Sequence, residues 1–331
     1  MSTLDAIARR RNTTHSVMRP MTHSAASMVQ LSSGKTGKLY AIADLHLGHK
    51  FNASAWESLQ PHLDDSLIIC GDIGENMDHL NNAFMKARAN FAKVYWVPGN
   101  HELYTMPNSG HKALRGEAKY QACVAIAQAH GILTPENEWE KWEGDGGPVI
   151  IALCFTLYDY SFRPKDVSRE GALAWAREDR GTQATDETLL HPDPYETRDD
   201  WCRARVAVTE KKLAEAKATG VPLVIVNHWP LREDLVTIPL APRFTLWCGT
   251  TLTKDWHKDY NAKVVVTGHL HVRRTDWIDE TRFEEVSLGY PKQWESARQE
   301  GKDVNDILRE ILPGPPEPGE GELRRVFRRN G

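Results

Sequence analysis

Short apolar runs alternate with amphipathic stretches over most of the chain. The apolar runs have the length and composition of buried strands, and they predict strands at 38–45, 66–72, 93–97, 148–157, 222–227 and 263–267. Two further runs, 273–278 and 282–288, flank a turn at residues 279–280 and predict a hairpin. The stretches between the strands predict helices at about 52–63, 77–90, 116–130 and 199–219. This alternating order indicates an α/β layered domain.

Both ends of the chain lack this pattern. Residues 1–37 are rich in Ser, Thr, Met and Arg, and we expect a disordered leader there, with a basic interaction arm as the alternative. We expect the folded domain at 38–312, followed by a Pro- and Gly-rich disordered tail at 313–331. Residues 158–198 carry many acidic residues and prolines and break the strand–helix alternation, so we interpret them as an insertion.

Composition narrows the class of protein. The 331 residues are 40% apolar and 26% charged, close to the averages of globular proteins, which argues against wholesale disorder. No stretch of uncharged apolar residues is long enough to span a membrane, so no membrane partner is expected. The 41 basic and 45 acidic residues give a net charge of −4, which disfavours a nucleic-acid partner. Five scattered cysteines without a CxxC pair are typical of the reducing cytoplasm.

The candidate chemistry lies directly after the predicted strands. In α/β sheets, the residues just past the carboxyl ends of strands converge on one crevice. Here those positions hold carboxylates, one amide and several imidazoles, namely Asp44, His46, Asp72, Asn100, His101, His228, His269 and His271.

Such ligands suit Mn, Fe or Zn rather than Ca or Cu(I). Seven of them are too many for one ion, but if one aspartate bridges, two ions have four protein ligands each and can share a bridging hydroxide. Two metals about 3.5–4 Å apart stabilise the attacking and leaving oxygens of an in-line displacement at phosphorus. The D-x-H and H-x-H spacings point both side chains the same way from an extended strand.

Each motif alone is weak, since a turn or a hydrogen-bonded histidine explains it equally well. Together, DxH, GD, GNHE, H and GHxH in this order resemble the calcineurin-like metallophosphoesterase family from Asp44 to His271. The resemblance implies a four-layer αββα sandwich, in which two mixed sheets are flanked by helices and a dimetal site lies at the strand carboxyl ends.

The resemblance also implies roles for individual residues. Asp44, His46 and His271 correspond to ligands of a first metal, and Asn100, His228 and His269 to those of a second, with Asp72 bridging. His101 matches the histidine that protonates the leaving oxygen after the bridging hydroxide attacks. The implied cofactors are two metal ions, Mn or Fe or both, with Zn also suited to these ligands.

The substrate is less firmly indicated. Strings at 227–231, 243–249 and 287–294 resemble an actinobacterial branch similar to the phosphopantetheinyl hydrolases. Those enzymes cleave the phosphodiester between 4′-phosphopantetheine and a serine of acyl carrier protein, so holo acyl carrier protein is the implied partner. A phosphomonoesterase, a cyclic-nucleotide or other small-molecule phosphodiesterase and a nuclease remain alternatives. A protein-assembly scaffold of the same fold is the non-enzymatic alternative.

The sequence does not assign residues that bind the organic part of the substrate. Residues that could border the site are His49, Lys50, Arg232, Arg243 and Trp247. For docking an acidic carrier protein, the candidate basic residues are Arg243, Lys254, Lys258, Arg273 and Arg274.

Overall fold

A four-stranded sheet carries the first half of the candidate site. The computed structural model describes residues 37–107 and 114–328. In the first sheet the strand order is β10-β1-β2-β3. Strands β1 (Leu39–Ile42), β2 (His62–Cys70) and β3 (Phe91–Val97) are parallel, and β10 (Arg309–Leu312) runs antiparallel to β1. Because β1, β2 and β3 are parallel, the loops that follow them emerge at one edge.

The second sheet has seven strands in the order β11-β8-β9-β7-β6-β5-β4. Its parallel centre consists of β5 (Val149–Leu153), β6 (Leu223–Val226), β7 (Ala262–Thr267) and β9 (Thr281–Glu285). The antiparallel strands are β4 (Lys141–Trp142), β8 (Arg274–Ile278) and β11 (Arg325–Phe327).

The two sheets pack face to face through one face of each strand. Leu39 and Ala41 of β1 belong to the same buried cluster as Val224 and Val226 of β6. The residues between them in sequence point to the outer faces, as the two-residue period of a strand requires. Strands buried on both faces read as continuous apolar runs, which is why these strands could be predicted from the sequence.

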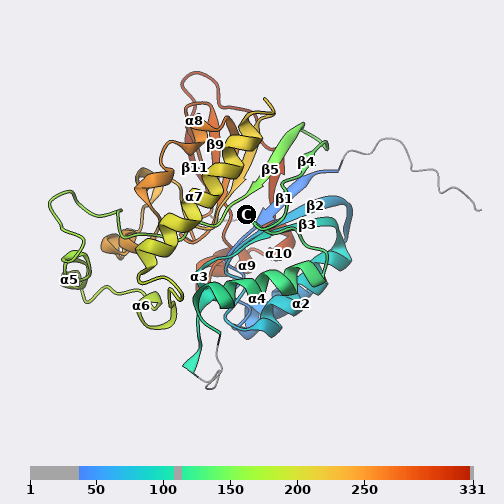
Figure 1. Ribbon diagram of the computed structural model, residues 1–331. Helices are drawn as coiled ribbons and strands as arrows, with labels where there is room; N and C mark the ends of the chain where they lie inside the picture. Colours follow the sequence, from blue (N-terminus) through green and yellow to red (C-terminus); the bar gives the residue numbers. More distant parts are fainter. Residues whose placement is uncertain (1–36, 108–113, 329–331) are drawn as a thin grey trace, which may run out of the picture. The chain divides into compact units, whose positions relative to one another are not determined.

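Helices cover the outer faces of both sheets. Side chains of α2 (Met77–Asn90), α4 (Gly116–Ala129) and α7 (Arg198–Lys217) belong to one buried cluster, which also contains Ile69, Trp96 and Ile225 from the strands. Figure 1 shows α2 and α4 beside β2 and β3, with α7 on the other side of the molecule near β5. The predicted αββα sandwich is therefore confirmed.

The remaining helices are short and lie in the connections. They are α1 (Lys50–Glu57), α3 (Asn100–Leu103), α5 (Ala172–Glu178), α6 (Asp186–Leu189), α8 (Trp256–Asp259), α9 (Glu295–Gln299) and α10 (Val304–Ile307). The 3₁₀ helices are Glu233–Leu235, Pro242–Trp247, Thr251–Thr253 and Pro291–Trp294. Among the described residues, no helix is long and apolar enough to cross a membrane. All five cysteines are buried free thiols.

Two expectations about the ends of elements need correction. The helix predicted at 52–63 ends at Glu57, because residues from His62 onward already form β2. The disordered tail predicted from residue 313 is wrong for Arg325–Phe327, which pair antiparallel with β8. A strand of three exposed residues has no apolar alternation to reveal it, and its pairing depends on a partner far away in the sequence. The interpretation of 158–198 as an insertion stays a prediction, and residues 1–36 lie outside the described part.

Candidate metal centre

The loops that follow five strands bring all the predicted ligands to one place. Asp44 and His46 follow β1, Asp72 follows β2, and Asn100 begins α3 after β3. The ligands from the second sheet are His228, which follows β6, and His269 and His271, which follow β7. Side chains far apart in the sequence thus meet because the strands that carry them are parallel within each sheet.

The first group of donors consists of Asp44, His46 and His271. The Nε2 atoms of His46 and His271 lie 3.1 Å apart, and Asp44 Oδ1 lies 2.9 Å from His271 Nε2. One ligand atom from each of the three side chains falls within 4.8 Å of the others. The three residues predicted for the first metal therefore form one compact set.

The second group consists of Asp72, His228 and His269, with Asn100 beside them. His269 Nδ1 lies 3.3 Å from His228 Nε2 and 3.2 Å from Asn100 Oδ1, and Asp72 Oδ2 lies 3.5 Å from His228 Nε2. Asp72, His228 and His269 again form a set whose ligand atoms lie within 4.8 Å of one another. These are the residues predicted as ligands of the second metal, together with the predicted bridge Asp72.

The chemistry of these donors fits two metal ions. Two imidazole nitrogens that face each other at 3.1 Å cannot both carry a proton there, and a shared cation satisfies both lone pairs. His228 Nδ1 donates a hydrogen bond to the Cys70 carbonyl oxygen at 2.8 Å, which leaves the Nε2 lone pair directed at the site. Oxygen and imidazole donors of this kind suit Mn, Fe and Zn alike, so the donor set does not choose the metal.

The ligand loops adopt a strained backbone. Asp44, His46, Asp72, His269 and His271 all have positive φ angles, between 45° and 72°. Residues other than glycine rarely adopt this region, and such strain concentrates at functional sites.

Glycines let these loops approach one another closely. A Cβ on Gly99 would lie 2.2 Å from Asp72 Oδ1, and one on Gly268 would lie 2.5 Å from Asp44 Oδ2. Any other residue at these two positions of the GNHE and GHxH motifs would therefore clash with the neighbouring carboxylate.

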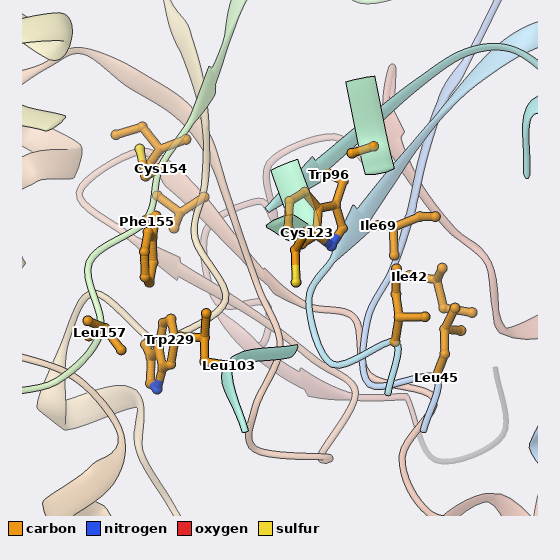
Figure 2. Close-up of a cluster of buried hydrophobic side chains, with 14 of the residues drawn as sticks. Ile42, Leu45, Ile69, Trp96, Leu103, Cys123, Cys154, Phe155, Leu157 and Trp229 are labelled. Atoms are coloured by element: carbon orange, nitrogen blue, oxygen red, sulfur yellow. The ribbon is translucent and has the colours of Figure 1, made fainter. Parts of the chain in front are cut away.

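Apolar residues next to the ligands anchor the loops in the core. Leu45, Leu103 and Trp229 are fully buried and belong to the large cluster on the outer faces of the sheets. Figure 2 shows these three side chains within that cluster. Each of them follows a polar residue of the site region, so packing of the core fixes where the polar side chains point.

Glu102 joins two of the ligand loops, a role that the sequence did not reveal. Its buried carboxylate accepts hydrogen bonds from the backbone N–H groups of Asp72, Ile73 and Gly99 at 2.7–3.0 Å. Burial, together with the Asp72 carboxylate, raises the pKa of Glu102 to about 7. The final residue of the GNHE motif thus holds the loops after β2 and β3 together.

The two aspartates of the centre are held as anions. Burial alone raises the pKa of Asp44 and of Asp72. The neighbouring imidazoles of His271 and His228 outweigh this effect, so both carboxyl groups have a pKa below the ordinary range. Asp44 also accepts hydrogen bonds from the Ser287 hydroxyl at 2.7 Å and from the His269 backbone N–H. An anionic, buried pair of carboxylates is the environment that a dication requires.

His101 lies at the edge of both groups. Its Nδ1 lies 2.9 Å from Glu75 Oε1, and its Nε2 lies 3.9 Å from Asp72 Oδ2. Burial lowers the pKa of His101, but the carboxylates of Asp72 and Glu75 outweigh burial and raise it to about 9. The contact of Nδ1 with Glu75 therefore orients the ring so that Nε2 faces Asp72.

Tyr290 borders the same side of the centre. Its ring stacks on His46 with 4.2 Å between the centroids, and its hydroxyl oxygen lies 3.4 Å from His101 Nε2. The string 287–294 was singled out in the sequence only by resemblance. A single tyrosine in a loop has no sequence pattern that indicates a place beside the site, so only the structure reveals the position of Tyr290.

A buried polar network fixes the amide of Asn100. Its Nδ2 donates to the Tyr104 hydroxyl at 2.9 Å and to Asp186 Oδ1 at 3.1 Å, so the amide oxygen faces His269. Tyr104 in turn donates to Asp186 at 2.6 Å. Because Asp186 belongs to α6, the segment predicted as an insertion contributes to positioning a predicted ligand.

Two candidate substrate residues do not serve as expected. Arg232 pairs with Asp234 at 2.7 Å, and Trp247 is fully buried, with its indole N–H donating to Glu187. Phe244, three residues before Trp247, instead stacks near His269 with 6.2 Å between the centroids. The aromatic side chain that borders the centre here was therefore missed.

The predicted docking residues also need correction. Arg273 and Arg274 are 6% and 2% exposed, and their guanidinium groups donate to carbonyl oxygens and to Asp276 inside the protein. Arg243 and Lys258 are paired with Glu178 and Asp279, respectively. Buried or paired cations cannot attract an acidic partner. Lys254, the remaining residue of this set, has no carboxylate partner within the described part of the chain.

Comparison with known proteins gives the family of this arrangement. A family profile described as calcineurin-like phosphoesterase matches residues 37–273. The chain is 44% identical over 287 residues to the [acyl-carrier-protein] phosphodiesterase PptH of Mycobacterium tuberculosis, covering 86% of each protein. It also resembles the crystal structure of phosphopantetheinyl hydrolase (PptH) from that organism, with a TM-score of 0.78, 45% identity, and coverage of 86% of this chain and all of that one.

Asp72 is the residue predicted to bridge the two ions, so its removal tests the dinuclear arrangement. We expect Asp72→Asn to bind fewer than two Mn²⁺ ions per chain and to lose phosphoester hydrolysis by more than about a hundredfold, since loss of an outer partner of a ligand alone costs about 10- to 100-fold. Bound metal is measured by equilibrium dialysis and folding by circular dichroism.

Asp64→Asn is the matched control, because Asp64 is an exposed carboxylate at the other end of the same strand. The control should keep both metals. An Asp72→Asn protein that keeps full turnover, and keeps it after a chelator has removed the metal, would contradict the dinuclear arrangement.

Proposed function

This chain belongs to the calcineurin-like phosphoesterase family, and from that premise we propose that it hydrolyses the phosphodiester that joins 4′-phosphopantetheine to a serine of an acyl carrier protein. The observation that carries the proposal is the 44% identity to an acyl-carrier-protein phosphodiesterase over most of both chains. The complete donor set supports hydrolysis rather than a scaffold, since a protein that only assembles others has no need of seven converging ligands.

In this proposal, each residue of the centre has a separate role in the reaction. Asp44, His46 and His271 would hold one ion, Asn100, His228 and His269 the other, and Asp72 would bridge. Two bound ions supply Lewis acidity, which neutralises the phosphoryl oxygens and activates water as the nucleophile. Mn and Fe are the ions that we propose, and Zn suits the same ligands. The buried free cysteines agree with a reducing cytoplasm as the place of action.

His101 is the proton donor in this proposal. Its Nε2 faces the centre while Glu75 accepts from Nδ1, so a proton on Nε2 can pass to the serine oxygen as the P–O bond breaks. The oxygen leaves as a neutral hydroxyl on the apo carrier protein, and the phosphate stays on the pantetheine arm. Tyr290, 3.4 Å from the same nitrogen, borders the path of the leaving group.

The substrate assignment is tested by comparing esters. Purified protein with Mn²⁺ is incubated with a holo acyl carrier protein, cyclic AMP, an aryl phosphomonoester and an aryl phosphodiester. We expect the carrier protein to lose its phosphopantetheine, as followed by intact mass, with a kcat/KM higher than for any of the small esters. An unchanged holo carrier protein together with fast hydrolysis of a monoester or of cyclic AMP would favour one of the alternative esterases.

The role of His101 predicts a dependence on the leaving group. We expect His101→Asn to slow release of the serine alkoxide by about 10²- to 10⁴-fold, because an alkoxide needs a proton to leave. Hydrolysis of a p-nitrophenyl diester should fall far less, since its leaving group is stable as an anion. The control is His130→Asn, in which a histidine at the end of α4 is replaced. Equal losses on both substrates would show that His101 does not act as the acid.

A further inference from the structure

We propose that the carrier protein docks on a basic surface beside Tyr290, made of His49, Lys50, Phe51, Lys292 and Arg298. We call it the α1–α9 surface, since its residues lie at the start of α1 and in or next to α9. The inference rests on the proposed function, because it names the face through which the same centre meets its protein substrate.

The chemistry of the ester dictates that the carrier protein contacts the rim of the centre. The scissile P–O bond joins the carrier-protein backbone through a single serine methylene group. The leaving oxygen must also lie next to the proton on His101. The carrier protein therefore has to lie on the side of the centre where His101 and Tyr290 are, and the phosphopantetheine arm extends away from it.

The α1–α9 surface is continuous with that side of the centre. The Tyr290 ring contacts His49, with 5.4 Å between the centroids, and Lys292 follows two residues later in the same segment. His49 is also hydrogen-bonded through its backbone N–H to the carbonyl oxygen of the ligand His46. A partner seated on His49 and Lys292 is thus in direct reach of the leaving-group position.

An exposed aromatic residue lies in the middle of this surface. Phe51 is 44% exposed, unusually high for its type, and its ring contacts Trp294 with 5.5 Å between the centroids. The Arg298 guanidinium lies 3.8 Å from the Phe51 ring centroid and 5.3 Å from the Trp294 ring centroid. A partly exposed aromatic ring that packs against a tryptophan and an arginine is typical of an interface anchor.

The charge of the surface fits an acidic partner. Within the part of the chain that the structure describes, neither Lys50 nor Lys292 has a carboxylate partner. By contrast, the cations Arg243 and Lys258 are neutralised by Glu178 and Asp279. Acyl carrier proteins are small acidic proteins, and unpaired lysines at the rim of an interface chiefly accelerate association with such a partner.

The test compares a protein substrate with a small one. We measure kcat/KM of wild type and of a Lys50→Glu/Lys292→Glu double variant on a holo acyl carrier protein and on bis(p-nitrophenyl) phosphate. We expect the ratio of the two values to fall by about 10- to 100-fold in the double variant, mainly through KM for the carrier protein. Salt should weaken the reaction of wild type on the carrier protein and affect the double variant much less.

Lys211→Glu is the matched control. Lys211 is an exposed lysine in the second half of α7. The carboxyl end of this helix leads to the amino end of β6, and the centre lies at the carboxyl ends of the strands. It should keep the wild-type ratio and salt dependence. A double variant with the wild-type ratio, in a protein that does release phosphopantetheine, overturns the docking surface and leaves the proposed function standing. A wild type that releases none overturns both.

Discussion

Close approach of buried donor atoms is the constraint around which this molecule is organised. The Nε2 atoms of His46 and His271 lie 3.1 Å apart, and the Nδ1 atom of His269 lies 3.3 Å from His228 Nε2. Buried polar donors at such short distances are stable only when opposite charges compensate one another. They also require a backbone that brings the ends of several strands close together. The parallel strands of both sheets, the positive φ angles of the ligand loops and the glycines between them all serve that approach.

The convergence of the predicted ligands on one place could be predicted from the sequence, because each of them follows a strand that the apolar pattern identifies. A strand buried on both faces is a continuous apolar run, and the polar residue after it stands out. Tyr290, Asp186 and Phe244 could not be found in this way, since they lie in connections without regular periodicity. The role of Glu102 was equally hidden, because its hydrogen bonds go to backbone groups of two loops.

Elements of the fold with a regular apolar pattern were likewise predictable from the sequence, and those without one were not. The central strands and the long helices α2, α4 and α7 were predicted nearly at their observed bounds, since their apolar faces pack on the sheets. Strands β4, β10 and β11 were missed. Strand β4 has only two residues, and β10 and β11 carry charged residues and pair with partners distant in sequence. The predicted docking arginines failed for a related reason. A sequence shows that Arg273 is basic, but not that carbonyl oxygens inside the protein already use its charge.

According to this account, water attacks the phosphorus atom and the serine of the carrier protein leaves on the side of the centre where His101 lies. Hydrolysis of a holo acyl carrier protein in H₂¹⁸O, followed by mass spectrometry of both products, tests this claim most directly. The account predicts one ¹⁸O atom in the phosphate of the released phosphopantetheine and an unlabelled serine on the apo carrier protein. Label on the serine, dehydroalanine in its place, or a holo carrier protein that stays intact would contradict it.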